Sequence, residues 1–168
     1  MRNNIPIIIT ENDINLRLIR FLIIIEILAY TTRGKLILNL DKLTIFDFLI
    51  KYPFLLKQVL ALKNKTSLKL LNIESGSVSS LFPNKITLLD IKHAKELTKL
   101  MIAYNMIDVV QEKNELFYIL TEKGKTIVNR TETDYTMRIK ELCNEMLILR
   151  SVSTSELKKI VNPLVKGI

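Results

Sequence analysis

The chain has 168 residues, of which 48% are hydrophobic, and a formal net charge of +8. This length suits one domain with a substantial core. The longest hydrophobic run, residues 16–30, is interrupted by Arg17, Arg20 and Glu26, which excludes a membrane span there. A single cysteine excludes an intramolecular disulfide, and the N-terminus has no secretion signal, so we expect a cytoplasmic protein.

The N-terminal part is predicted to begin with a short strand or extended arm at residues 5–9. Residues 10–13 resemble a capping box, and the helix that follows is expected to reach Tyr30. Its hydrophobic residues lie on nearly all sides. Such a helix is central to a core or shared with another chain.

Two further helices are predicted before residue 64. Asp41 is the expected cap of the first, whose hydrophobic face includes Phe46 and Leu49. Pro53 cannot continue that helix but suits the first turn of the next, which should end near Lys63. Residues 64–89 are predicted to be rich in loops, and a short helix at 77–81 would complete a helix-turn-helix.

A helix, a hairpin and another helix are predicted between Asp90 and Arg130. Thr87 or Asp90 can cap the first helix, and Asn105 suits its end. Two runs rich in β-branched and aromatic residues, 106–110 and 115–120, are joined by a polar turn at 111–114. Thr121 is the expected cap of the closing helix, which should continue through residue 128.

This segment resembles the second half of a winged helix, because Tyr118 is followed by Leu120-Thr121 and then Gly124. We therefore predict a mainly α fold with a small β-hairpin, that is, a winged-helix-like α+β domain with additional N- and C-terminal helices. Its parts are a helical region at 1–88, the winged-helix half at 89–130 and C-terminal helices at 131–168. We expect them to form one compact unit.

The first C-terminal helix carries a hydrophobic stripe with coiled-coil-like spacing, and a last helix should follow the capping box at 153–156. The stripe is predicted as a docking element for an ATPase or for a second copy of the chain. Packing of the same stripe on the helix at 16–30 is an equally weighted alternative. The stripe consists of Tyr135, Ile139, Leu142, Met146 and Leu149.

Basic residues gather in two places that could face nucleic-acid phosphates. Residues 48–73 contain no acidic residue, and a solvated basic face is the alternative to a phosphate-facing patch there. The second place is one face of the helix that begins near Asp90, although that helix offers no arginine for contacts to guanine. The candidate residues are Lys57, Lys63, Lys65 and Lys69, and then Lys92, Lys95 and Lys99.

No pattern of a catalytic or metal site is recognisable. The sequence has one histidine, His93, and one cysteine, Cys143, and its four glycines form no phosphate-binding loop. His93 is expected on the surface and Cys143 at least half-buried. We therefore predict a protein that is not an enzyme, with no catalytic, cofactor-binding or metal-binding residues and no cofactor.

The stretch Leu40 to Leu60 resembles the middle components of bacterial three-component ABC-ATPase systems, including the small accessory subunit of Lamassu-type anti-phage systems. The residues on which this resemblance rests are Leu40-Asp41-Lys42-Leu43, Phe46-Asp47-Phe48-Leu49-Ile50, Pro53 and the leucine-rich helix that follows it. The resemblance implies a non-enzymatic adaptor between an SMC-like ABC ATPase and an effector, often a nuclease. Non-specific contact with double-stranded DNA and a homodimer are further expectations. The alternative is a winged-helix transcriptional regulator.

Overall fold

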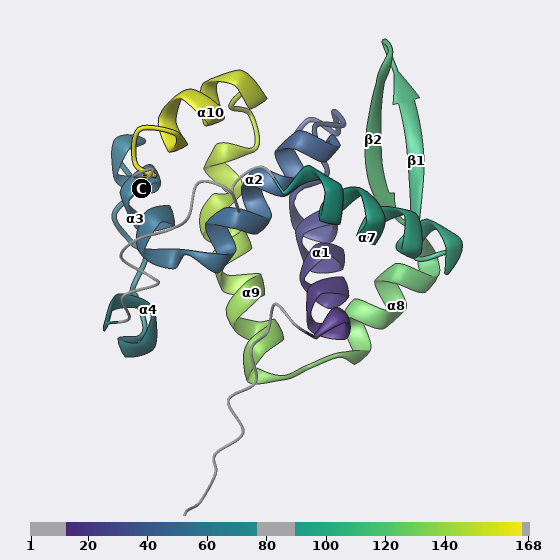
Figure 1. Cartoon of the computed structure of the whole chain (residues 1–168), viewed down its shortest axis with the longest axis horizontal. Coiled ribbons are helices and arrows are strands. Elements are labelled where there is room, and N and C mark those ends of the chain that lie inside the picture. Colours follow the sequence, from purple (N-terminus) through teal and green to yellow (C-terminus); the bar gives the residue numbers. More distant parts are fainter. Residues whose placement is uncertain (1–12, 77–89, 166–168) are drawn as a thin grey trace, which may run out of the picture.

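The computed structural model describes residues 13–76 and 90–165 of the chain. Within these ranges the fold is mainly helical with one small antiparallel hairpin, as the sequence predicted (Figure 1). The elements are α1 (Ile14–Leu28), α2 (Leu40–Lys51), α3 (Pro53–Leu62), α4 (Asn72–Gly76), α7 (Ile91–Ala103), β1 (Ile107–Glu112), β2 (Glu115–Leu120), α8 (Glu122–Arg130), α9 (Asp134–Glu145), the 3-10 helix η2 (Met146–Leu149) and α10 (Thr154–Val161).

Helix α1 stands at the centre of the fold, with α9 on one side and α7 and α8 on the other (Figure 1). Asp13 caps its start by accepting from the backbone N–H groups of Asn15 and Leu16. Every residue from 19 to 25 is buried. Of the two alternatives predicted for this helix, the structure therefore shows a place at the centre of the core.

Helices α2 and α3 follow a short connection and meet at Tyr52. Asn39, not Asp41, caps α2, since its side chain accepts from the backbone N–H of Lys42 at 2.9 Å. Asp41 lies in the first turn instead. Pro53 occupies the first position of α3, as predicted. A backbone N–H at that position has no hydrogen-bond partner within the helix, so proline loses no bond there.

The predicted helix, hairpin and helix are present as α7, β1–β2 and α8. Asp90 caps α7, Thr121 caps α8, and Asn105 has the positive φ of 56° that ends α7. The predicted turn at 111–114 was too long. Lys113 and Asn114 both adopt positive φ, which makes a two-residue turn, so β1 continues to Glu112 and pairs with β2.

The hairpin is tied to the N-terminal half through the connection between α1 and α2. Tyr118 N–H donates to the Leu38 carbonyl at 3.0 Å, and Tyr30 forms a bridge with Leu36. An extended segment therefore lies along β2 without forming a full third strand.

The predicted C-terminal helix is two elements, α9 and η2, and α10 follows its predicted cap Ser153. The hydrophobic stripe faces inward, and Tyr135 Oη donates to the Leu16 carbonyl at 3.4 Å. The docking role predicted for this stripe is therefore not available in the folded chain, because the intramolecular alternative, packing against α1, occupies it. The buried members are Ile139, Leu142, Met146 and Leu149.

Four sequence predictions lie outside the described residues. They are the strand or arm at 5–9, the capping residue Thr10, the short helix at 77–81 and the candidate cap Thr87.

Candidate nucleic-acid and partner interface

Helix α7 presents three lysines on its solvent face. Its other face is buried through Ala94, Leu97 and Met101, which fixes the rotation of the helix. The exposed positions then recur at spacings of three and four residues, which lie on one side of a helix. The three side chains form no ion pair with another described residue, so this cationic row is open to an anionic partner. They are Lys92, Lys95 and Lys99.

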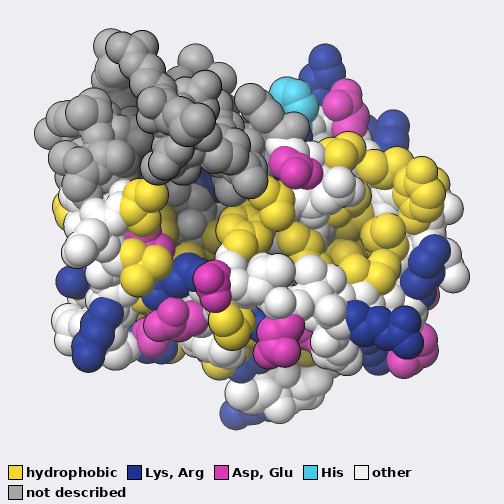
Figure 2. Space-filling model, turned by 90° about the horizontal axis from the view of Figure 1, so that it is seen from below, with side chains coloured by type: hydrophobic (Ala, Val, Ile, Leu, Met, Phe, Trp, Pro, Cys, Tyr) yellow, Lys and Arg dark blue, Asp and Glu magenta, His cyan; other side chains and the backbone are white. Residues whose placement is uncertain are grey.

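Two hydrophobic side chains are exposed at the end of α7. Ile102 is 43% and Tyr104 55% exposed, and Lys123 of α8 donates to the Tyr104 carbonyl at 2.8 Å. Figure 2 shows hydrophobic side chains gathered in the area between α7 and α8. At the other end of α7, His93 lies on the surface beside Asp90, as expected. The combination of a hydrophobic area and a lysine row suits a macromolecular partner.

The four lysines predicted around α3 do not form one open patch. Lys63 pairs with Glu156 at 2.8 Å, and Lys65 pairs with Glu145 at 3.1 Å. Lys57 and Lys69 are exposed and have no ion pair within the described ranges. Lys63 and Lys65 thus join the α3 region to the C-terminal elements. Of the four, Lys57 and Lys69 are the ones that can contact an external anion.

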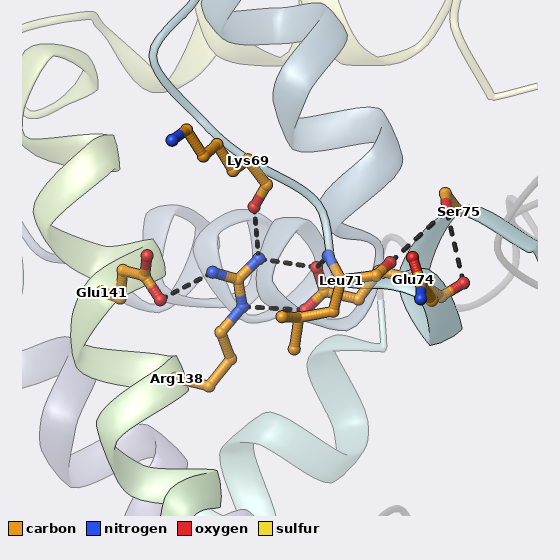
Figure 3. Close-up of polar contacts among 7 residues, drawn as sticks. Lys69, Leu71, Glu74, Ser75, Arg138 and Glu141 are labelled. Atoms are coloured by element: carbon orange, nitrogen blue, oxygen red, sulfur yellow. Dashed lines mark hydrogen bonds and ion pairs between the residues drawn. The ribbon is translucent and has the colours of Figure 1, made fainter.

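The backbone around Lys69 is held against α9 by Arg138 (Figure 3). The guanidinium donates to both carboxylate oxygens of Glu74, at 2.9 and 2.6 Å, to the Lys69 carbonyl at 2.9 Å and to Glu141 at 2.7 Å. Glu74 also accepts from the Leu71 N–H at 2.9 Å. The side chain of Lys69 points away from this cluster. Arg138 thereby anchors α4 to α9.

A second charged cluster lies inside the fold. Asp47 binds Arg20 at 2.6 Å and Lys51 at 3.0 Å, and Arg20 also donates to the Tyr135 hydroxyl at 3.2 Å. Burial raises the pKa of Asp47, but the charges of Arg20 and Lys51 lower it by more, so its net pKa is below the ordinary value. This cluster joins α1, α2 and α9 and is structural.

One buried cation had no role in the sequence analysis. Lys42 is only 4% exposed, and its ammonium donates to the carbonyls of Arg150 and Val152 at 2.5 and 2.7 Å. The signal was present in the sequence, because Lys42 lies four residues before Phe46 and therefore on the hydrophobic face of α2.

The described residues contain no group of three or more His, Cys, Asp or Glu side chains that could hold a metal ion. Cys143 is fully buried, as expected, and burial raises the pKa of its thiol. A thiol of raised pKa is a poor nucleophile at neutral pH.

None of the helices within residues 13–76 and 90–165 is long and hydrophobic enough to cross a lipid bilayer. Residues 28–159 match the model of a protein family described as ABC-three component (ABC-3C) system Middle Component 4. The match begins at the end of α1 and continues into α10, so it includes α7, the hairpin and the Arg138 cluster. No curated protein and no solved structure matches the chain.

Proposed function

Since the chain belongs to the Middle Component 4 family of ABC-three component systems, we propose that it is a non-enzymatic adaptor that binds an SMC-like ABC ATPase and links it to an effector. A middle component has an accessory role in a system of several components and therefore has protein partners. The resemblance to Lamassu-type accessory subunits extends the proposal to anti-phage defence in the bacterial cytoplasm, with a nuclease as the effector.

The single observation that carries the proposal is the exposed face of α7. Three exposed lysines along this helix are followed by Ile102 and Tyr104 at its end. No carboxylate among the described residues pairs with these lysines. A helix with exposed lysines along its length and exposed hydrophobic side chains at its end can contact an anionic polymer through the lysines and a protein through the hydrophobic end. We assign the ATPase to the hydrophobic end and the phosphates of double-stranded DNA to the lysine row.

The expected DNA contact is weak and independent of sequence. Lysines bind phosphates as point charges, and no arginine on α7 is available to read guanine. Lys57 and Lys69 lie near α3, on the opposite side of α1 in Figure 1, and are a separate, second candidate for phosphates. A second copy of the chain, giving a homodimer, is the alternative occupant of the same hydrophobic end.

The adaptor role is tested by co-expression with the ABC ATPase of the same system, followed by size-exclusion chromatography with light scattering. We expect a stable complex that is lost in Ile102→Asp with Tyr104→Asp. Leu62→Asp is the matched control, because Leu62 is 62% exposed on α3 and lies away from α7. The isolated chain should hydrolyse neither ATP nor DNA. Turnover by the pure chain, or a complex that survives the α7 change, would refute the proposal.

The DNA contact is tested by fluorescence anisotropy with duplexes of two unrelated sequences. Both duplexes should bind equally, and replacing Lys92, Lys95 and Lys99 by alanine should reduce the slope of log K against log salt by about 3, or about 1 for each lysine. Lys57→Ala with Lys69→Ala measures the second candidate surface. An unchanged slope after both sets of changes would leave the DNA contact without support.

A transcriptional regulator is the second candidate, favoured by the order α7, β1, β2 and α8 and by the tie between Tyr118 and Leu38, which resemble a winged helix. The turn of the hairpin argues against it, since Glu112 and Glu115 are exposed there and repel phosphates. Tight binding of one duplex and not the other would favour the regulator.

A further inference from the structure

A hollow of about 760 Å³ opens where three parts of the chain meet: residues 31–42, the start of β2 and residues 150–155. In Figure 1 this region lies between α10 and the hairpin, where the chain turns from α1 into α2. Sites for small molecules have volumes of roughly 300–1,000 Å³. None of the lysines predicted to contact nucleic acid lines this hollow, so it is separate from the α7 surface.

The charges that line the hollow are unbalanced. Two carboxylates, of Asp41 and Glu115, face four cationic side chains. Asp41 is already bound by Lys158 at 2.6 Å, and Lys158 does not line the hollow. One carboxylate therefore remains against the four cations, and the hollow attracts anions. The cations are Arg33, Lys35, Lys42 and Arg150.

Lys42 is the most informative of these cations because it is buried without a counter-charge. Its ammonium donates to the carbonyls of Arg150 and Val152 and lies 5.9 Å from the centre of the Phe46 ring, and it forms no ion pair with any carboxylate in the described part of the chain. Burial, and to a smaller extent the charge of Lys35, lowers the pKa of Lys42 to about 8. An unpaired buried cation is costly, and an anion in the hollow would offset that cost.

The other side of the hollow is preformed for hydrogen bonding. The Arg150 guanidinium is fixed by two backbone carbonyls, since Nη1 donates to Tyr30 at 2.9 Å and Nε to Leu147 at 3.3 Å. Its Nη2 has no partner among the described residues. Four hydroxyl side chains follow in the segment that leads into α10, and they are Ser151, Ser153, Thr154 and Ser155. A fixed guanidinium loses little entropy when it binds an oxyanion.

We propose that this hollow binds a phosphate-bearing small molecule, with Arg33, Lys35 and Arg150 around the phosphate oxygens, Lys42 behind them, and Phe117 and Leu36 as the hydrophobic wall for the rest of the ligand. A phosphate group matches this set better than a carboxylate does, because it offers more acceptor oxygens to the several separate donors. Thr154 and Ser155, in the first turn of α10, line the hollow, so the helix dipole adds a favourable potential for an anion. The volume accommodates a nucleotide as well as a smaller phosphate ester.

The test is isothermal titration calorimetry of the full chain in phosphate-free, low-salt buffer with ATP, pyrophosphate and inorganic phosphate as separate probes. We expect saturable binding of one molecule per chain. Arg33→Glu with Lys35→Glu should weaken it by roughly 10- to 100-fold, the range for charge-assisted contacts. Both side chains are exposed, so the variant should fold. Lys42→Met, checked by circular dichroism, should weaken binding in the same direction.

The matched control is Lys57→Glu with Lys69→Glu, which makes the same change of charge at two exposed residues outside the hollow. This control should bind the probes like the unchanged chain. Tighter binding of ATP than of pyrophosphate would identify a nucleotide as the ligand, and equal binding a smaller phosphate compound. Absence of saturable binding to every probe, or equal weakening in both double variants, would overturn the proposal. A poly-glutamate peptide that binds where the phosphates do not would overturn it in favour of an acidic protein segment.

Discussion

Replacing Leu142 by alanine should destabilise the chain strongly, because this side chain lies in the core between α9 and α1. Leu142 is only 2% exposed and belongs to the same buried cluster as Ile139 and Met146. Truncation of a buried leucine costs about 2–5 kcal/mol, through lost burial and the cavity left behind. For a chain of this size each kcal/mol lowers the midpoint of thermal unfolding by about 2–4 °C, so 3 kcal/mol corresponds to about 6–12 °C.

The assay is urea and thermal denaturation followed by circular dichroism. Met137 supplies the control, since it lies on the same helix but is 49% exposed, and Met137→Ala should change the free energy of unfolding by less than about 0.5 kcal/mol. If Leu142→Ala unfolded at the same temperature as the unchanged chain and lost a partner or a dimer instead, the stripe would be an intermolecular surface. The intramolecular packing described above would then be refuted.

Three further predictions concern contacts that hold separate elements together. A Cβ at Gly124 would lie 2.1 Å from the Met106 carbonyl oxygen, so Gly124→Ala should cost about 1–3 kcal/mol in urea denaturation despite the better helix propensity of alanine, and a gain would contradict the structure. The pKa of Asp47 is lower in the folded chain than its ordinary unfolded value of about 3.9. Its contribution to the free energy of unfolding is therefore fully present above about pH 3.9 and is lost as the pH falls through the folded pKa. Asp47→Asn should therefore reduce the loss of stability on acidification, and an unchanged acid profile would exclude this role. Glu74→Gln leaves Arg138 half-buried without its bidentate partner and should cost about 1–3 kcal/mol, with faster amide exchange in α4, whereas unchanged exchange would argue against the anchor.

The features that sequence alone predicted well are local ones. Thr121 and Ser153 were recognised as caps, and Asp90 as one of two candidates, because a capping side chain bonds to an N–H only two or three residues away. Pro53 was placed in a first helical turn for a similar reason. Each of these depends on a few neighbouring residues, so periodicity and residue type suffice.

Features that depend on distant residues were not predictable in the same way. The periodicity of α9 showed that one face is hydrophobic, but not that α1 covers it. The contact of Arg138 with Glu74 was not predicted, because the two residues lie 64 positions apart in the chain. The position of Lys42 four residues before Phe46 places it on the hydrophobic face of α2, but its carbonyl partners follow about 100 residues later, so the local pattern could not show what the ammonium binds.

The pairing of α1 with α9 also has a consequence for the synthesis of this chain. Helix α1 is hydrophobic on all sides, and α9, which covers one of them, leaves the ribosome about 100 residues later, a delay of roughly 5–20 s at ordinary elongation rates. During that interval the nascent chain exposes hydrophobic surface that no later-made element yet covers. It is therefore at its most prone to aggregation before its last quarter is made. A gene truncated before α9 should yield insoluble protein or a complex with chaperones.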